Sequence, residues 1–159
     1  MRTFLSSPLG LLSIEADNSG IFSIQFSEND SINRDERTPY LYWNQHVREC
    51  IRQLEQYFNG TRNNFSLNLH LKGTGFQKKV WKAVMSIPFA ETVSYKYIAE
   101  EIGQPKSFRA VGNANRLNKI AIIIPCHRVI GINGKLTGYA AGIHRKQWLL
   151  SHEKKYANK

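Results

Sequence analysis

The sequence has 159 residues, of which 42% are hydrophobic, and a formal net charge of +10. A chain of this length can bury a hydrophobic core as one domain or as two small ones. No apolar stretch approaches the ~20 residues that a membrane helix needs, and residues 1–8 lack the apolar core of a signal peptide, so we expect a cytoplasmic protein without a membrane partner.

Only two cysteines, Cys50 and Cys126, are present. Two thiols cannot build a disulfide framework, and no cluster of Cys and His has the spacing of a zinc finger. The sequence therefore predicts neither a structural metal nor a bound cofactor, and it favours a reducing, intracellular location.

The basic charge is unevenly distributed along the chain. Residues 1–72 carry seven Lys and Arg against eight Asp and Glu, whereas the residues from 73 onward carry 15 against four. A one-sided excess of this kind is typical of a surface that binds a polyanion by neutralising its phosphates. A basic surface that served only solubility would not explain why the first half is nearly neutral.

Residues 1–72 are expected to form a small α+β domain. Leu9–Glu15 and Gly20–Phe26 flank a turn-rich segment, which is typical of a β-hairpin, and a polar loop follows over 27–38. Apolar residues at helical spacing then predict a helix over about 43–58 that ends at Gly60. The apolar positions are Val47, Ile51, Leu54 and Phe58, with Cys50 on the same face. Strict alternation over Phe65–Leu71 indicates a half-buried strand.

Residues 73–159 are expected to form a second domain, which begins with a helix capped by Thr74 and ended by Pro88. One apolar stripe runs along this helix. Its members are Phe76, Val80, Val84 and Ile87. Ser94 can cap a further short helix, whose apolar residues are Ile98, Ala99 and Ile102 and whose end is marked by Gly103–Pro105.

A helix over Ser107–Arg116 follows and should bury Phe108 and Val111. Two short helices around a Gly-containing turn form a helix-turn-helix pattern. The second helix carries small residues where a reader of the major groove would carry long polar ones. They are Ala110, Gly112 and Ala114. They suit either close approach to a narrow groove or tight helix packing, but packing alone leaves Arg109 unexplained.

The apolar run Ile120–Ile124 reads as a buried strand that ends at Pro125, directly before Cys126 and His127. A thiolate beside a base is a strong nucleophile, so a pocket at the end of this strand could hold a reactive cysteine. Taken alone, the pair favours a small buried side chain beside a surface histidine over a reactive cysteine.

The segment around this pair decides between these readings, because it resembles the O6-alkylguanine-DNA alkyltransferases. The resemblance covers nearly all of residues 73–153. It rests on motifs that stand in the order found in that family, namely 73–77, 80–81, 87–88, 92–95, 102–105, 109–118, 125–130, 138–139 and 149–153. It implies a small N-terminal domain with an antiparallel sheet, then a mostly helical domain with a winged-helix-like helix-turn-helix motif.

The resemblance also implies a reaction. Cys126 would accept the alkyl group of O6-alkylguanine, and of O4-alkylthymine, irreversibly and once per protein molecule. His127 would act as the base through a bridging water, and Glu153 would orient it. Tyr95 would hydrogen-bond the flipped base and donate a proton to it. Asn118 would tie the second helix to the active-site strand, although Lys119 follows it where many members have proline.

The family further implies a monomer that binds double-stranded DNA through the minor groove and flips the damaged base. Arg109 matches the arginine that fills the vacated stack, and Arg116 is expected to contact phosphate. The predicted DNA-contacting residues are Arg109, Ala110, Gly112, Asn113, Ala114 and Arg116. The predicted walls of the base pocket are Tyr95, Val129, Tyr139 and Ala140, whose small members leave room for lesions larger than methyl.

Two other functions compete with DNA repair by alkyl transfer. A lesion-binding relative on the same scaffold would recognise alkylguanine without chemistry, but such proteins lack the acceptor cysteine. An unrelated thiol hydrolase or zinc deaminase is the other alternative, and a deaminase requires a Pro-Cys-x-x-Cys motif. The chain has Pro125 and Cys126 without the second cysteine, so the sequence favours alkyl transfer.

Overall fold

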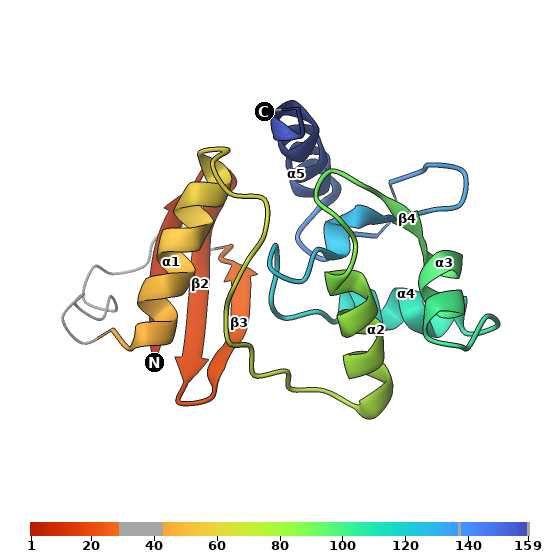
Figure 1. Ribbon diagram of the computed structural model, residues 1–159, viewed down its shortest axis with the longest axis horizontal. Helices are drawn as coiled ribbons and strands as arrows, with labels where there is room; N and C mark the ends of the chain where they lie inside the picture. Colours follow the sequence, from red (N-terminus) through yellow and green to blue (C-terminus); the bar gives the residue numbers. More distant parts are fainter. Residues whose placement is uncertain (29–42, 137, 159) are drawn as a thin grey trace. The chain divides into compact units, whose positions relative to one another are not determined.

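The computed structural model describes residues 1–28, 43–136 and 138–158. The chain divides into two compact units, Met1–Leu71 and Lys72–Lys159 (Figure 1). Most of the loop predicted over 27–38 lies outside the described residues. Among the residues that are described, no helix is both long and apolar enough to cross a membrane.

The first unit contains an antiparallel sheet with the strand order β1-β2-β3. Its strands are β1 (Arg2–Ser7), β2 (Gly10–Asp17) and β3 (Gly20–Phe26). The predicted hairpin is therefore confirmed as β2 and β3, whereas β1 was not predicted. In β1 only Thr3 is buried, so its sequence lacks the alternation of a half-buried strand.

Helix α1 (Gln45–Phe58) lies across one face of this sheet (Figure 1). Asn44 caps it by accepting a hydrogen bond from the Val47 amide at 3.0 Å, and the helix buries the predicted apolar stripe against the strands. Cys50 is fully buried in that stripe. Burial raises the pKa of its thiol to about 12, so the prediction that Cys50 serves packing is confirmed.

The strand predicted over Phe65–Leu71 is absent, and only an isolated bridge joins Leu69 to Ile21 of β3. The alternation of burial is present, since Ser66 and Asn68 are exposed between half-buried apolar residues. No ladder forms at Ser66, because its amide and carbonyl are hydrogen-bonded at 2.8 and 3.0 Å to the Gln53 side chain of α1. Periodicity therefore predicted the buried side correctly but not the backbone pairing.

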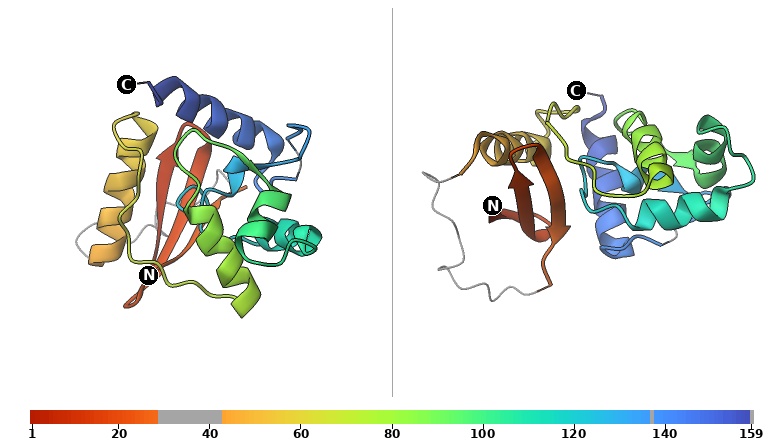
Figure 2. Two further views of the ribbon diagram at one scale, coloured as in Figure 1. Left: turned by 45° about the vertical axis from the view of Figure 1, so that its right-hand side comes forward. Right: turned by 90° about the horizontal axis from the view of Figure 1, so that it is seen from below.

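The second unit is mostly helical. Its elements are α2 (Gly75–Met85), β4 (Val93–Ser94), α3 (Tyr95–Glu101), α4 (Phe108–Arg116), the 3-10 turn η3 (Cys126–Arg128), β5 (Val129–Ile130) and α5 (Ile143–Tyr156). Helices α2, α3 and α4 pack against one another, and β4 pairs in parallel with β5. The α+β class and the helix-turn-helix formed by α3 and α4 agree with the prediction; two views of them are shown in Figure 2.

Side-chain caps start α2 and α3 where the sequence predicted. Thr74 and Gln77 form a reciprocal capping box at α2, and Ser94 accepts a hydrogen bond from the Tyr97 amide at α3. The first turn of α4 departs from prediction. Val111 is fully buried as predicted, but Phe108, which was also predicted to be buried, is 46% exposed.

The apolar run Ile120–Ile124 is a buried turn, and the prediction of a strand is wrong. Ile122 has φ of 72°, and the Ile123 amide donates to the Ala121 carbonyl at 2.8 Å. A short run of β-branched residues signals burial without distinguishing a strand from another buried segment. The turn brings the chain to Pro125, after which η3 presents Cys126.

Candidate active site

Cys126 begins η3 and is 7% exposed. Its amide donates to the Ile124 carbonyl at 2.7 Å, and its own carbonyl accepts from Asn115 Nδ2 at 3.2 Å. The Sγ atom lies 3.2 Å from Asn118 Nδ2. The cysteine is therefore held by its backbone while an amide group faces its sulfur.

Asn118 lies just after α4 and joins that helix to the turn before Cys126. Its Nδ2 donates to the Ile124 carbonyl at 3.0 Å, and its Oδ1 accepts from the Ile120 amide at 2.9 Å. These bonds do not depend on the next residue, Lys119, which is exposed. One side chain thus braces the turn and contacts the Cys126 sulfur.

His127 and Glu153 form a fully buried pair. The Nε2 of His127 lies 2.7 Å from Glu153 Oε1, and neither residue is exposed. Glu153 comes from α5 and also accepts from the Ala90 amide at 3.2 Å. Among the described residues the buried Nδ1 of His127 has no hydrogen-bond partner.

Arg128 completes the surroundings of Glu153, and the sequence analysis gave it no role. Its Nε and Nη2 donate to the two Glu153 oxygens at 2.8 and 2.9 Å, and its Nη1 donates to the Ile87 carbonyl at 2.8 Å. A buried carboxylate with a two-point guanidinium partner is held in one orientation. Burial would raise the pKa of Glu153, but His127 and Arg128 outweigh it and hold the pKa well below its usual range.

The protonation state of His127 follows from these contacts. Burial lowers the pKa of His127, and the charges of Arg128 and Lys146 add to this against the opposing Glu153. The ring is therefore neutral near neutral pH. Because the Glu153 carboxylate accepts from Nε2, the hydrogen-bond network assigns the proton to Nε2 and leaves a lone pair on Nδ1. His127 can thus act as a base through Nδ1.

Lys146 of α5 is a fully buried lysine that the sequence analysis missed. Its Nζ donates to the Val129 carbonyl at 2.6 Å. Burial raises the pKa of the Cys126 thiol, while the Asn118 amide and the Lys146 charge oppose the rise. The spacing of Lys146, Leu149 and Glu153 places all three on one face of a helix, and this pattern could have indicated that Lys146 is buried.

Two tyrosines were predicted to line the base pocket. Tyr139 has a buried hydroxyl without a hydrogen bond of good geometry among the described residues, and its pKa is raised well above the usual value by burial and then by Cys126. Tyr95 is half-buried, and a Cβ added to Gly112 would lie 3.6 Å from its ring. Gly112 therefore turns its open side toward Tyr95. Ala140 is exposed, and Val129 is buried with its carbonyl on Lys146.

The outer face of α4 carries most of the predicted DNA-contacting residues. Arg109, Ala110, Asn113 and Arg116 are exposed, and the last two are hydrogen-bonded to each other at 2.9 Å. The prediction that Ala114 contacts DNA is wrong, because its side chain is buried: the residue is 2% exposed, and its carbonyl accepts a hydrogen bond from Trp81 Nε1 at 2.8 Å. Its small side chain serves the packing of α4 on α2 rather than the outer face.

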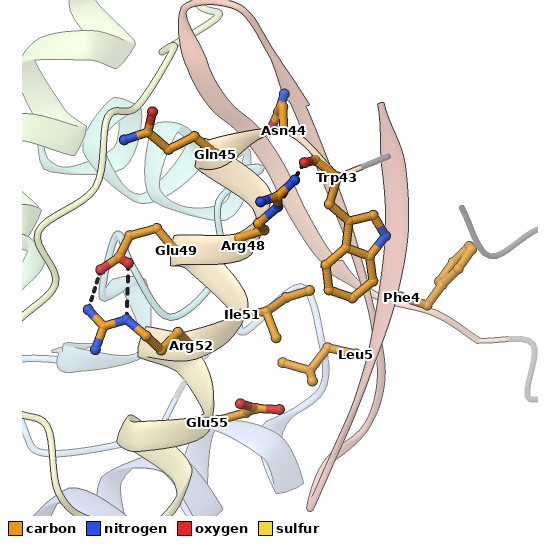
Figure 3. Close-up of a pocket in the computed structure, with 10 residues that line it drawn as sticks. All are labelled: Phe4, Leu5, Trp43, Asn44, Gln45, Arg48, Glu49, Ile51, Arg52 and Glu55. Atoms are coloured by element: carbon orange, nitrogen blue, oxygen red, sulfur yellow. Dashed lines mark hydrogen bonds and ion pairs between the residues drawn. The ribbon is translucent and has the colours of Figure 1, made fainter. Parts of the chain in front are cut away.

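The first unit has a groove of its own between α1 and β1 (Figure 3). Three of its charged side chains have partners within this unit: Arg48 donates to the Trp43 carbonyl at 3.0 Å, and Arg52 pairs with Glu49. No cysteine lines it. Within the described part of the chain, no group of three His, Cys, Asp or Glu side chains could hold a metal ion.

Comparison with known proteins agrees with both units. Residues 75–155 match the family model described as "6-O-methylguanine DNA methyltransferase, DNA binding domain", and residues 1–71 match its "ribonuclease-like domain". A Methanosarcina barkeri protein named methylated-DNA--protein-cysteine methyltransferase is 46% identical, with 94% of each chain covered. The chain belongs to the 6-O-methylguanine DNA methyltransferase family.

Further relatives of this family support the assignment. A Mycobacterium leprae protein of the same name is 44% identical, with 94% of this chain and 90% of the relative covered. The crystal structure of Mycobacterium tuberculosis OGT in complex with DNA superposes with a TM-score of 0.86 at 44% identity. That match covers 98% of this chain and 93% of the other. The family assignment therefore applies to nearly the whole length of the chain.

Proposed function

We propose that this protein repairs DNA by moving the alkyl group of O6-alkylguanine to Cys126. The activity is that of a methylated-DNA--protein-cysteine methyltransferase, as in the relatives at 46% and 44% identity. The observation that carries the assignment to this residue is the buried network around it. Cys126 contacts the Asn118 amide, and the adjacent His127 is paired with Glu153.

The reaction is a displacement at the alkyl carbon. The Cys126 thiol passes its proton through a bridging water to His127 Nδ1, and the resulting thiolate attacks the carbon. The sulfur–carbon bond forms as the carbon–O6 bond breaks, and the electron pair of the broken bond stays on guanine. Tyr95 gives a proton to the departing base and regains one from solvent as His127 loses its own. The products are S-alkylcysteine and unmodified guanine.

Several charges favour the thiolate in this scheme. Glu153 stabilises the imidazolium that forms, and Arg128 holds the carboxylate in place. Lys146 places a positive charge in the same buried region, where electrostatic interactions are stronger than in water. The Asn118 amide lies against the sulfur and can donate to it. Because a thioether offers water no good leaving group, each molecule acts once.

The substrate base reaches this buried thiol by leaving the DNA stack. The outer face of α4 docks in the minor groove, whose limited sequence information suits a protein that scans any sequence. Arg109 is exposed on this face and fills the space that the extruded nucleotide leaves. Tyr139 and Ala140 stand beside the pocket, which also admits O4-alkylthymine and groups larger than methyl.

We assign the two parts of the chain different roles. Residues 73–159 carry the DNA-binding helices and the acceptor cysteine, and residues 1–72 support them. The basic excess lies in the same part as the acceptor, so phosphate contacts and chemistry are on one unit. A monomer contains every residue that the scheme uses, and it acts with DNA inside the cell.

Intact-mass measurement tests the proposal. Incubation with duplex DNA that contains O6-methylguanine should add one methyl group to the protein, and Cys126→Ser should abolish the gain while it leaves lesion binding nearly intact. Cys50→Ser is the matched control and should gain the same mass as the wild type. An unchanged mass with retained binding of the lesion would instead identify a lesion-binding protein without chemistry.

A further inference from the structure

One exposed aromatic side chain has no role in the scheme above. Phe108 is the first residue of α4 and is 46% exposed. It stands seven residues before the buried Asn115 and so shares its side of the helix. At the start of α4, however, no residue from Ser107 to Ala110 is buried: Ser107 is half-buried and the next three are exposed.

The neighbour of Phe108 gives this exposure a meaning. Single exposed apolar side chains are common and need no explanation by themselves. Here the phenyl ring stands directly before Arg109, at the end of the helix proposed to enter the minor groove. Lys106, two residues earlier, is also exposed, so the ring has an exposed basic residue close to it in sequence on each side. In the proposed complex, a ring at this end of α4 lies beside the DNA bases rather than in bulk solvent.

Proteins that bend DNA from the minor groove insert apolar wedges, phenylalanine among them, between neighbouring base pairs. The wedge partly unstacks the step and lowers the further cost of extruding a nucleotide. We propose that Phe108 is such a wedge, acting on the base pair next to the damaged one while Arg109 occupies the vacated position. This inference rests on the proposed function, and it adds a positioning residue to it.

Substitution separates the wedge from the chemistry. Phe108→Ala should slow alkyl transfer from duplex DNA roughly tenfold, as expected for loss of one base–aromatic contact. Transfer from free O6-benzylguanine should be unchanged, because a free base needs no extrusion. Phe108→Leu retains an apolar wedge and should keep most of the duplex rate.

Ile143→Ala is the matched control. Ile143 is also the first residue of its helix, α5, and is 44% exposed, but it is not on α4. Its substitution should leave both rates unchanged. The salt dependence of DNA binding should stay the same in all three variants, because none changes a charge. An unchanged duplex rate in Phe108→Ala, or an equal loss on the free base, would overturn the wedge.

A second measurement keeps the wedge testable if alkyl transfer itself fails. The probe is a duplex with 2-aminopurine beside O6-methylguanine, whose fluorescence rises when its stacking is broken. Wild type should raise the signal, and Phe108→Ala should raise it much less at equal DNA occupancy. A wild type that gains no mass would refute the proposed function, whereas equal fluorescence in wild type and Phe108→Ala would refute the wedge alone.

Discussion

At the scale of single residues, Lys146 distinguishes this site from an ordinary buried cysteine. Burial alone keeps a thiol protonated, and the pKa of Cys126 is raised for that reason. A buried ammonium and an amide donor act in the opposite direction. The balance between burial and these two groups sets how readily the thiolate forms.

Lys146→Gln tests that balance. The neutral amide can still donate to the Val129 carbonyl, but the positive charge is lost, so the pKa of Cys126 should rise further. The pH profile of Cys126 alkylation by a small thiol reagent should move to higher pH, and the transfer rate near neutral pH should fall. Lys155→Gln, at an exposed position of the same helix, should change neither. A profile that stays in place would show that Lys146 acts only as a structural donor.

The His127–Glu153 pair predicts how stability depends on pH. The pKa values of both groups are lowered in the folded protein. Each group therefore stabilises the fold above its unfolded pKa, about 6.5 for histidine and about 4.3 for glutamate. As pH falls below about 6.5, the unfolded state binds the His127 proton more readily and the free energy of unfolding should decrease.

Denaturant unfolding between about pH 8 and pH 5 measures this dependence. The window starts at the unfolded histidine pKa of about 6.5, and wild type should lose stability below it. His127→Gln cannot titrate and should show a flatter profile over the same range, whatever its absolute stability. Equal slopes for the two proteins would mean that His127 is not held neutral by its surroundings.

At the scale of elements, the start of β3 depends on a glycine. Gly20 has φ of +143°, and a Cβ there would lie 2.3 Å from the Asn68 carbonyl oxygen. Gly20→Ala should therefore lower the free energy of unfolding by about 1–3 kcal/mol. Gly75→Ala is the control, because nothing lies within 4 Å of its added Cβ. Similar stabilities for the two variants would contradict the close approach of Asn68.

Helices were predicted well from the sequence because caps and periodicity agree at Thr74 and Ser94. The two predicted strands that failed are the alternating segment 65–71, which pairs with β3 only around Ile21 and is bonded to the Gln53 side chain at Ser66, and the apolar run 120–124, which is a turn. Sequence patterns report burial but not the partner of each amide. Lys146 and Arg128 were missed for a related reason, since charged residues are presumed exposed until a buried partner is known.

The helix α4 makes a prediction of its own through Arg109. Arg109→Ala should slow repair in duplex DNA by roughly ten- to hundredfold, because extruding a base costs a few kcal/mol and the arginine offsets part of it. Transfer from free O6-benzylguanine should not change. Loss of both activities to the same extent would place Arg109 in the chemistry or the fold instead.

At the scale of the whole molecule, the basic charge and the proposed acceptor cysteine lie in the same unit. The part of the chain that carries the basic excess also carries Cys126 and α4. Non-specific phosphate contacts can therefore bring the acceptor to any DNA sequence without a separate binding domain. In the proposed mechanism the buried thiol makes the protein specific, because only an extruded base can reach it.

The central claim is that Cys126 accepts one alkyl group and keeps it. The most direct test is a titration in which limiting protein meets an excess of duplex DNA containing O6-methylguanine, with repaired guanines counted and the adduct mapped by peptide mass. We predict one repaired base per protein molecule, with the methyl group on the peptide that contains Cys126. Several repaired bases per molecule, or a methyl group on any other residue, would contradict this account.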